Sequence, residues 1–291
     1  MAKLRHIETV DEMTRLAAQL RGQGKSIGLV PTMGYLHEGH LALAEAARGE
    51  NDVVIMSIFV NPAQFGPGED FETYPRDLER DAALAEEAGV DILFHPEPAD
   101  MYPTDGGIRI LPGPQADVLC GASRPGHFDG VLKVITKLFH IASPDRAYFG
   151  EKDAQQLALI ETFVRDFNFP VEIRRIPTVR EEDGLAKSSR NVCLDAEERK
   201  AAPAIRQALA EGEQIFRKNG ERERALQEVR RRLGEIPGAA LDYAELLEYP
   251  SLQPATKESR EVIIAAAVRF GSVRLIDNVL IPVKEAAACS K

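Results

Sequence analysis

Apolar runs alternate with amphipathic segments along the first part of the chain. Residues 27–30 and 52–60 are almost wholly apolar, as is typical of strands buried on both faces of a parallel sheet. Residues 11–21 and 77–89 instead carry apolar side chains at the spacing of an amphipathic helix. Pro31 is expected to end the first strand, because its ring nitrogen has no hydrogen for a sheet ladder. This alternation predicts an α/β fold: a Rossmann-like parallel sheet with helices on both faces.

The pattern continues to residue 179 and changes beyond residue 191. In the first part we further expect loops with a short hairpin between 96 and 128, helices at 128–141 and 154–167, and strands at 146–149 and 171–179. In the last part we expect long charged helices at 195–218 and 221–233, followed by strands at 241–247, 262–268 and 273–280. This change in the pattern of expected helices and strands predicts two domains, 1–182 around the parallel sheet and a smaller α+β domain at 183–291.

Composition and charge narrow the class of protein. Of the 291 residues, 44% are hydrophobic and 28% charged, as in a globular protein. The net charge of -10 disfavours a nucleic-acid binder, which would need a basic face. We expect no membrane segment or signal peptide, because no apolar run is long enough. Three widely spaced cysteines, Cys120, Cys193 and Cys289, predict reduced thiols and a cytoplasmic location.

Residues 28–40, GLVPTMGYLHEGH, contain the strongest functional signal. A buried strand leads through a tight turn into a helix start, which is where an open α/β sheet binds a phosphorylated ligand. His37 and His40 lie on the same first helical turn, so they could donate hydrogen bonds together to a developing phosphate charge. The pair could instead be half of a metal site or two solvated residues. The metalloprotease pattern HExxH is excluded, because Leu41 occupies its last position.

Three other segments carry side chains suited to anions or hydroxyl groups. Gln64 follows the second buried strand and offers a donor and an acceptor together. Lys152, in Gly150–Asp153, lies at a helix start and would make a good anion clamp, with Gln156 one turn further on. Lys187–Arg190 combines two hydroxyls with a guanidinium that can contact several phosphate oxygens. The alternatives are a structural amide, a solvated lysine and an exposed polar turn, respectively.

Weaker candidates lie in neighbouring segments. We expect residues 74–76 and 124–128 to line the site, without a specific role. Asp81 could contact a magnesium ion, although a position on a solvated helix face is the more ordinary expectation.

Six ordered motifs resemble those of the pantothenate synthetase (pantoate–β-alanine ligase) family: PTMGYLHEGH, SIFVNPAQF, YPRD, GHFDG, YFGEKDAQQL and TVREEDGLAKSSRN. This family belongs to the nucleotidyltransferase-like superfamily, which includes class I aminoacyl-tRNA synthetases. The match covers about Ile27 to Asn191, and the length and texture of the chain agree beyond it.

The resemblance implies roles for individual residues. It makes His40 the catalytic proton donor, and the charge that adenylation builds on phosphate oxygens makes His37 and Lys152 suitable as further catalytic donors. It implies that Gln64 contacts both pantoate and β-alanine, and that Gln156 contacts pantoate. The implied ATP-binding residues are Met33, Gly34, Tyr35, Leu36, His37, Glu38, Gly39, His40, Gly150, Glu151, Lys152, Asp153, Val179 (through its backbone, to adenine), Lys187, Ser188, Ser189 and Arg190. Lys187 departs from the family pattern, in which we expect Met or Leu, and could contact phosphate or face solvent.

The implied activity is the ATP-dependent condensation of (R)-pantoate with β-alanine to pantothenate, within coenzyme A biosynthesis. It proceeds through a pantoyl-adenylate and releases AMP and pyrophosphate. Magnesium is expected on the ATP phosphates rather than in a protein metal site, and the family suggests a homodimer. Domain 1–182 would bind the nucleotide and pantoate, and 183–291 would form a lid on the β-alanine side.

Two other function classes stay open: a nucleotidyltransferase that stops at a nucleotidyl product, and a non-catalytic nucleotide-binding module. Gln64 and Gln156 speak against the nucleotidyltransferase, because neutral amides suit a polyol acid better than a phosphate monoester.

Overall fold

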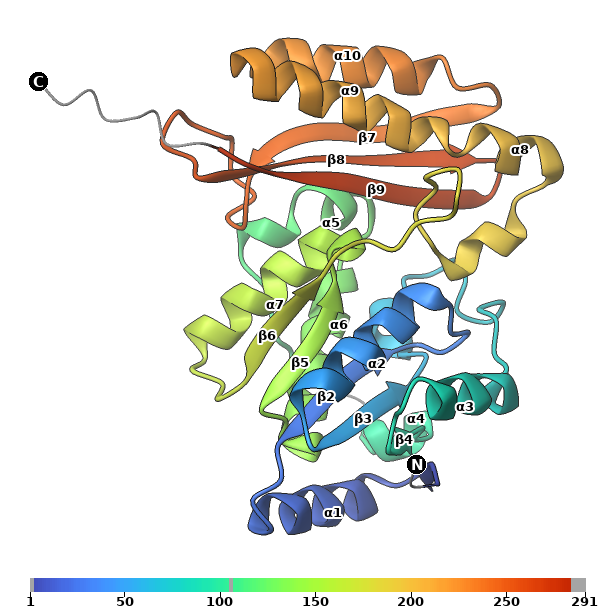
Figure 1. Cartoon of the computed structure of the whole chain (residues 1–291), viewed down its shortest axis with the longest axis vertical. Helices are drawn as coiled ribbons and strands as arrows, with labels where there is room; N and C mark the ends of the chain where they lie inside the picture. The colour runs from blue at the N-terminus through green and yellow to red at the C-terminus, as the bar shows by residue number, and fades with distance from the viewer. Residues whose placement is uncertain (1–2, 105–106, 284–291) are drawn as a thin grey trace, which may run out of the picture. The chain divides into compact units, whose positions relative to one another are not determined.

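The computed structural model describes residues 3–104 and 107–283, and Figure 1 shows the course of the chain. The chain forms two compact units. The first unit comprises Met1–Gly113, Arg124–Glu151 and Ile160–Val179, and the second comprises Pro114–Ser123, Lys152–Leu159 and Arg180–Lys291. The second unit therefore includes two short segments that precede residue 182 by many positions.

A six-stranded parallel sheet forms the centre of the first unit. Its strands lie in the order β1 (Arg5–Ile7), β4 (Ile92–Phe94), β3 (Val53–Ile58), β2 (Ile27–Thr32), β5 (Arg146–Gly150) and β6 (Glu172–Ile176). The helices of this unit are α1 (Val10–Gly22), α2 (Glu38–Glu50), α3 (Leu78–Glu87), α4 (Pro98–Met101), α6 (His127–Ala142) and the end of α7 (Ala154–Asp166). Helices lie on both sides of the sheet (Figure 1). The predicted Rossmann-like fold is confirmed.

Strands β2 and β3 lie in the middle of this sheet and are covered on both faces. Val30, Val54 and Met56 share a core cluster with residues of α2. Leu29 and Ile55, which alternate with them along the strands, are also fully buried. Because both sets of alternating positions are buried, both must be apolar, and this explains the continuous apolar runs.

Pro31 does not end β2, contrary to expectation. The strand continues to Thr32, and Pro31 is in register with Ser57 of β3. The Thr32 carbonyl accepts from the Phe59 amide on the β3 side, so Pro31, one residue earlier, turns its nitrogen toward the β5 side. The pairing of β2 with β5 ends at Leu29. The missing N–H therefore costs no ladder hydrogen bond.

Two further expectations are corrected. The described part of 96–128 contains short helical turns, among them α4 and α5 (Leu119–Ser123), where a hairpin was expected. The single helix expected over 195–218 is divided into α8 (Ala196–Ala201) and α9 (Ala204–Asn219). Pro203 lies at the break, because it has no amide hydrogen to continue a helix.

Three antiparallel strands and two long helices form most of the second unit. The sheet order is β7 (Ala239–Glu248), β8 (Glu261–Phe270) and β9 (Val273–Pro282), with β9 at an edge. Helices α9 and α10 (Arg222–Gly234) share one core cluster with this sheet. Gly212 allows the two helices to approach closely, because a Cβ there would lie 2.3 Å from Val229 Cγ2. The other face of the sheet packs against Leu119 and Ala154.

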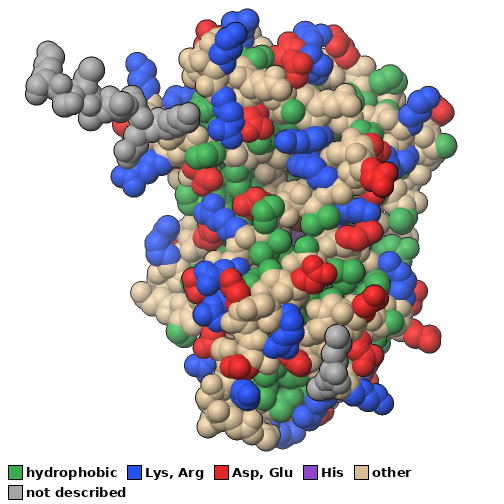
Figure 2. Space-filling model, in the orientation of Figure 1, with side chains coloured by type: hydrophobic (Ala, Val, Ile, Leu, Met, Phe, Trp, Pro, Cys, Tyr) green, Lys and Arg blue, Asp and Glu red, His purple; other side chains and the backbone are tan. Residues whose placement is uncertain are grey.

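The face seen in Figure 2 carries Lys and Arg side chains interspersed with Asp and Glu side chains. Arg231 and Glu228 of α10 form an ion pair of 2.7 Å. In the described ranges, no helix is both long and apolar enough to cross a membrane. Cys120 is buried and Cys193 is exposed, and both are free thiols, whereas Cys289 lies outside the described residues.

Candidate active site

The turn after β2 is held in an uncommon backbone shape. Gly34 and Tyr35 have φ angles of 84° and 49°, in the left-handed region that residues with a side chain rarely adopt. The Thr32 hydroxyl accepts from the Gly34 amide at 3.2 Å and donates to the Ser57 carbonyl at 2.7 Å. A Cβ at Gly34 would lie 2.9 Å from an Ile58 methyl group. Both the backbone angle and the available space therefore require glycine at this position.

Asp81 of α3 supports the same turn. Its Oδ2 accepts from the Tyr35 amide and its Oδ1 from the Leu36 amide, each at 2.7 Å. The residue is only 1% exposed, so the expectation of a solvated helix face is wrong. Burial raises the pKa of this carboxyl group, although the two amide hydrogen bonds act in the opposite direction. Asp81 thus stabilises the left-handed conformation of Tyr35.

His37 and His40 form the start of α2. His37 is the N-cap residue, and its Nδ1 accepts from the Gly39 amide at 3.1 Å. His40 Nδ1 accepts from the His37 amide at 3.3 Å. Because a backbone N–H can only donate, each neutral ring carries its hydrogen on Nε2. The rings stack with centroids 4.0 Å apart, so two Nε2–H donors are held side by side.

One of the two alternatives for this histidine pair, that of two solvated side chains, does not fit the structure. Across residues 3–104 and 107–283, no group of three or more His, Cys, Asp or Glu side chains is placed to hold a metal ion. Both histidines are half-buried and both bond to the backbone of the helix start. They are therefore fixed side chains rather than solvated ones.

Gln64 ends the 3-10 turn η1 (Pro62–Gln64), which begins a few residues after the end of β3. Its side chain is buried; Oε1 accepts from Asn61 Nδ2 at 3.0 Å, and Nε2 lies 3.1 Å from Met33 Sδ. Gly130 of α6 permits this arrangement, because a Cβ there would lie 2.1 Å from a carbonyl oxygen of η1. The amide of Gln64 therefore reaches the turn after β2, and the close approach of α6 fixes its position.

The backbone of Gln64 is held from the start of α6. His127 Nδ1 donates to the Gln64 carbonyl oxygen at 2.8 Å, and Arg124 Nη1 donates to His127 Nε2 at 3.1 Å. Arg124 also bonds to both carboxylate oxygens of Glu69, at 2.7 and 2.6 Å. Burial opposes ionisation of Glu69, but the hydrogen bonds from Arg124 and a backbone amide outweigh it and lower its pKa. Arg124 and His127 thus orient the Gln64 turn.

In the second unit, Lys152 lies in the 3-10 turn η3 (Glu151–Asp153), directly before α7. Its Nζ is 3.5 Å from Asp153 Oδ2, and its carbonyl oxygen accepts from Asn278 Nδ2 at 2.9 Å. The Lys152 side chain is 21% exposed, so it is not a freely solvated lysine. Gln156 lies on the first turn of α7 and is half-buried.

Within the candidate segment Lys187–Arg190, Ser188–Arg190 form a capped turn. Ser188 Oγ accepts from the Arg190 amide at 3.3 Å, so Ser188 is the N-cap of η4 (Ser189–Cys193). Ser189 is buried, and the alternative of an exposed polar turn is therefore wrong at this residue.

Lys187, which departs from the family pattern, has a protein partner. Its Nζ lies 2.8 Å from Glu181 Oε2, and its side chain is largely buried. Lys187 therefore does not simply face solvent.

The predicted site residues divide between the two units. The first unit contains Met33–His40, Gln64, Gly150, Glu151 and Val179, and the second contains Lys152, Asp153, Gln156 and Lys187–Arg190. Within the first unit, the structure brings together the turn after β2, the histidine pair and Gln64. Within the second, it attaches Lys152 and the η4 turn to the same strand, β9.

Comparison with known proteins identifies the family. A family model described as Pantoate-beta-alanine ligase matches residues 5–280. The pantothenate synthetase of Lysinibacillus sphaericus is 58% identical over 277 residues, which cover 95% of this chain and 98% of that protein. The pantothenate synthetase of Bacillus subtilis is 53% identical, with coverage of 97% and 99%.

Solved structures give the same result. A pantothenate synthetase from Thermus thermophilus matches with a TM-score of 0.89 and 48% identity, over 94% of this chain and 98% of that one. A pantoate-beta-alanine ligase from Francisella tularensis, solved in complex with beta-gamma ATP and beta-alanine, matches with a TM-score of 0.79 and 37% identity, over 95% and 97%. On the sequence match and the shared fold together, this chain belongs to the pantoate–β-alanine ligase family.

Proposed function

We propose that this chain catalyses the ATP-dependent condensation of (R)-pantoate with β-alanine to pantothenate. The observation that carries the proposal is the backbone-fixed histidine pair at the start of α2, in a chain whose relatives are named pantothenate synthetase. The complex of the Francisella tularensis ligase with beta-gamma ATP and beta-alanine supports the choice of substrates.

The chemistry requires that pantoate be activated first. A free carboxylate is a poor acyl donor, because oxide is not a usable leaving group. Attack of the carboxylate on the α-phosphorus of ATP gives pantoyl-adenylate and pyrophosphate. Attack of the β-alanine amine on the acyl carbon then gives the amide and AMP, with no covalent enzyme intermediate. Negative charge builds on the phosphate oxygens in the first step, so donors fixed in place before the reaction stabilise its transition state.

The proposed donors lie on three segments of the chain. His37 and His40 supply hydrogen bonds from their Nε2–H groups, and His40, in its protonated imidazolium form, is proposed as the proton donor. Lys152 supplies an ammonium group, and Ser188–Arg190 supply two hydroxyls and a guanidinium that can contact two phosphate oxygens at once. The backbone of Val179 is proposed to contact adenine. The histidine, lysine, serine and arginine roles each assign a donor to phosphate oxygens that become more negative during adenylation, whereas the Val179 contact would only position the nucleotide.

The neutral amides are proposed to recognise the acid substrate. Gln64 is buried, and neighbouring side chains hold its amide, so it can select a hydroxyl or carboxylate group of pantoate without rearranging. Gln156 is proposed as the second pantoate contact, and Gln64 also serves β-alanine. Because an acyl adenylate hydrolyses readily, the bound intermediate must be kept from water.

Magnesium and a second copy of the chain complete the proposal. Mg²⁺ keeps several waters and binds readily to substrate phosphates, so we propose that it arrives on ATP. Asp81 fits a supporting role better than that of a metal ligand, because both of its oxygens accept from backbone amides. A cytoplasmic homodimer is proposed from the family resemblance, and sedimentation of the purified chain tests its oligomeric state.

One assay tests the activity. The purified chain is incubated with ATP, pantoate and β-alanine, and labelled AMP and pyrophosphate are followed. AMP formation that depends on β-alanine supports the ligase. Continuous pyrophosphate release without any amine would indicate a nucleotidyltransferase, and nucleotide binding without turnover would indicate a non-catalytic module.

A further inference from the structure

Two neighbouring residues of β9 anchor the segments of the second unit that carry the proposed phosphate donors. Asp277 is 4% exposed and accepts hydrogen bonds from both terminal nitrogens of Arg180, at 2.7 and 2.9 Å. Asn278 is 7% exposed and donates from Nδ2 to the Lys152 carbonyl oxygen at 2.9 Å. Neither residue belongs to the motifs that carry the family resemblance.

The Asp277–Arg180 pair fixes the base of the loop that precedes η4. Arg180 Nη1 also donates to the Gly184 carbonyl at 3.1 Å, and Arg180 forms an isolated β-bridge with Ala186. The guanidinium therefore ties both sides of the loop to β9, and its two-bond contact with a buried carboxylate fixes its orientation. The η4 turn, which continues this loop, packs against β9 as well.

Asn278 acts on the other segment. Lys152 is the middle residue of η3, so a bond to its carbonyl fixes the peptide from which its side chain extends. The backbone amide of Asn278 donates to Asp277 Oδ1 at 2.8 Å, and this bond joins the two anchors. Asp277 lies on the same face of β9 as Leu275 and Val279, which belong to the core shared with α9 and α10. Asn278, the next residue, points to the opposite face. The two segments are thus anchored on the two faces of one edge strand.

The chemistry of the anchors fits positioning better than it fits stability. A buried ion pair adds little to stability compared with apolar side chains of similar volume, because removing two charges from water offsets most of their attraction. A carboxylate–guanidinium pair does, however, hold both partners in a single relative orientation. That property is useful where a loop must present donors to a substrate.

We propose that Asp277 and Asn278 are positioning residues for adenylation. They hold Ser188–Arg190 and Lys152 where these donors contact the phosphates of ATP, without touching the substrate themselves. The inference rests on the proposed function and names two residues that this function had not included.

Isosteric variants of the full chain test the proposal. Asn278→Asp keeps the shape of the side chain but replaces the donor to Lys152 with an acceptor. The expected result is an approximately tenfold rise in the KM for ATP or an equal fall in kcat for AMP formation, which corresponds to the loss of one hydrogen bond. The KM for pantoate should stay within about twofold of the wild type. Asp277→Asn should act in the same direction through the η4 loop.

Asp242→Asn is the matched control. Asp242 of β7 pairs with Arg274 of β9 at 2.8 Å, so this variant also weakens a carboxylate–guanidinium pair of the same sheet. Asp242 holds neither donor segment, and the KM for ATP should stay within about twofold of the wild type.

Amide hydrogen exchange without ATP is the second measurement. Exchange should be faster over 151–156 in Asn278→Asp and over 181–190 in Asp277→Asn. Unchanged kinetics and exchange would overturn the proposal. The proposal would also be overturned if Asn278→Asp and Asp277→Asn impaired the kinetic constants for ATP and for pantoate equally and Asp242→Asn had the same effect. If Asp277→Asn does not fold, Asn278→Asp alone decides. If the wild type forms no AMP, the proposed function fails, whereas the exchange data still decide whether β9 holds the two segments.

Discussion

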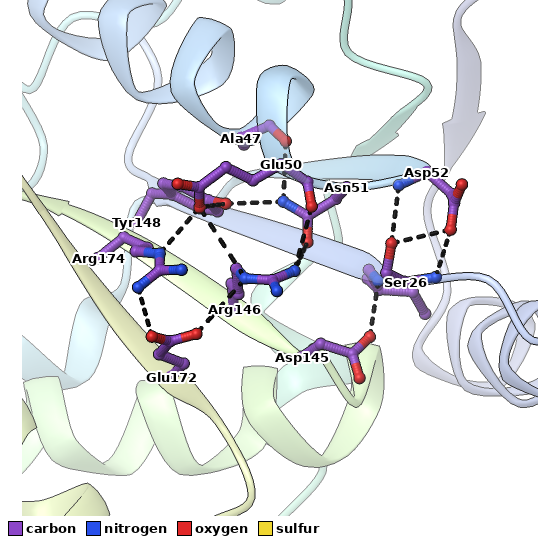
Figure 3. Close-up of polar contacts among 11 residues, drawn as sticks. Ser26, Ala47, Glu50, Asn51, Asp52, Asp145, Arg146, Tyr148, Glu172 and Arg174 are labelled. Atoms are coloured by element: carbon purple, nitrogen blue, oxygen red, sulfur yellow. Dashed lines mark hydrogen bonds and ion pairs between the residues drawn. The ribbon is translucent and has the colours of Figure 1, made fainter.

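The two ends of the parallel strands in the first unit are built from different kinds of contact. At the amino ends, side chains mainly bond to other side chains (Figure 3). Glu50 Oε2 accepts from Tyr148 Oη and from Arg174 Nε, both at 2.8 Å. Asn51 Nδ2 donates to Tyr148 Oη at 2.7 Å. This network joins α2, β5 and β6 and satisfies polar groups at the margin of the core.

At the carboxyl ends, side chains mainly bond to the backbone of turns. Asp81 accepts from two amides of the turn after β2, and His127 donates to the Gln64 carbonyl. The left-handed conformation of Tyr35 occurs in this region. Backbone strain is commonly stored at functional sites, where the surroundings over-determine it. The comparison indicates that side-chain contacts support the core at the amino ends, whereas at the carboxyl ends they hold the loops that carry the proposed site residues.

The largest effect is expected at the carboxyl ends, from His40→Ala. The substitution removes the proposed proton donor, and general acid catalysis typically contributes about a hundredfold to ten-thousandfold to a rate. The rate of adenylation should fall by that order, with little change in melting temperature. His140→Ala, at an exposed position of α6, is the control and should retain full activity. Near-normal turnover of His40→Ala would remove His40 from the mechanism.

Asp81→Asn should impair both stability and turnover. The asparagine NH₂ group would face one of the two backbone N–H groups that Asp81 now accepts from, and two donors cannot bond to each other. That buried N–H loses its acceptor, which should lower the unfolding free energy by about 1–3 kcal/mol. Turnover should fall about tenfold or more, because small displacements near a reacting centre are costly. Glu79→Gln, on the exposed side of α3, is the control. Wild-type kinetics in a destabilised Asp81→Asn variant would show that the turn plays no part in catalysis.

Gln64→Ala should mainly harm the use of pantoate. Losing one positioned amide costs about 1 kcal/mol or more of binding, so the KM for pantoate should rise about tenfold, with little change in the KM for ATP. Steady-state kinetics with each substrate varied in turn provide the measurement. An effect confined to ATP would assign Gln64 to the nucleotide instead.

Tyr148→Phe tests the other side of the comparison. Burial, with the Glu50 hydrogen bond, raises the pKa of Tyr148 to about 12, so its hydroxyl stays a neutral donor. Removing it breaks the bonds to Glu50 and Asn51 and should lower the unfolding free energy by about 1–2 kcal/mol. Denaturant unfolding measures this loss. The kinetic constants should not change, and a large loss of turnover would contradict the division between the two ends.

Glu50→Gln should have the smallest effect, visible mainly in acid. The hydrogen bond from Arg174, followed by that from Tyr148, lowers the pKa of Glu50 below its ordinary value of 4.5. A carboxyl group with a lowered folded-state pKa adds stability above its unfolded-state pKa and loses it as the pH falls. The wild type should therefore lose slightly more stability than Glu50→Gln between neutral pH and pH values below about 4.5. Because the Glu50 side chain is 43% exposed, solvent screens its ion pairs, and the difference should be below about 1 kcal/mol.

Much of the fold could be predicted because its signals are local. Continuous apolar runs indicated strands covered on both faces, and helical spacing located most helices. The expectation for Pro31 was wrong because a proline ends a strand only if its nitrogen faces a paired neighbouring strand. Which strand it faces depends on the order of the strands in the sheet, which the local sequence does not show. The three residues of β1 were too few to show any pattern.

The candidate site was predictable in part. The histidine pair could be inferred from its place between a strand and a helix, whereas its assignment to ATP came from the family resemblance and stays a proposal. Asp81 was misjudged because its two amide partners lie 46 and 45 residues away along the chain. Asp277 and Asn278 gave no local signal, since their partners Arg180 and Lys152 are 97 and 126 residues distant.

The decisive measurement follows the oxygen atoms of pantoate. When the carboxylate is labelled with heavy oxygen and turned over with ATP and β-alanine, adenylation predicts that one labelled oxygen appears in AMP, since the amine expels AMP together with that oxygen. The label should appear in AMP far more slowly in His40→Ala. Label found in inorganic phosphate instead, or AMP formed at the normal rate without label, would show that no pantoyl-adenylate is made.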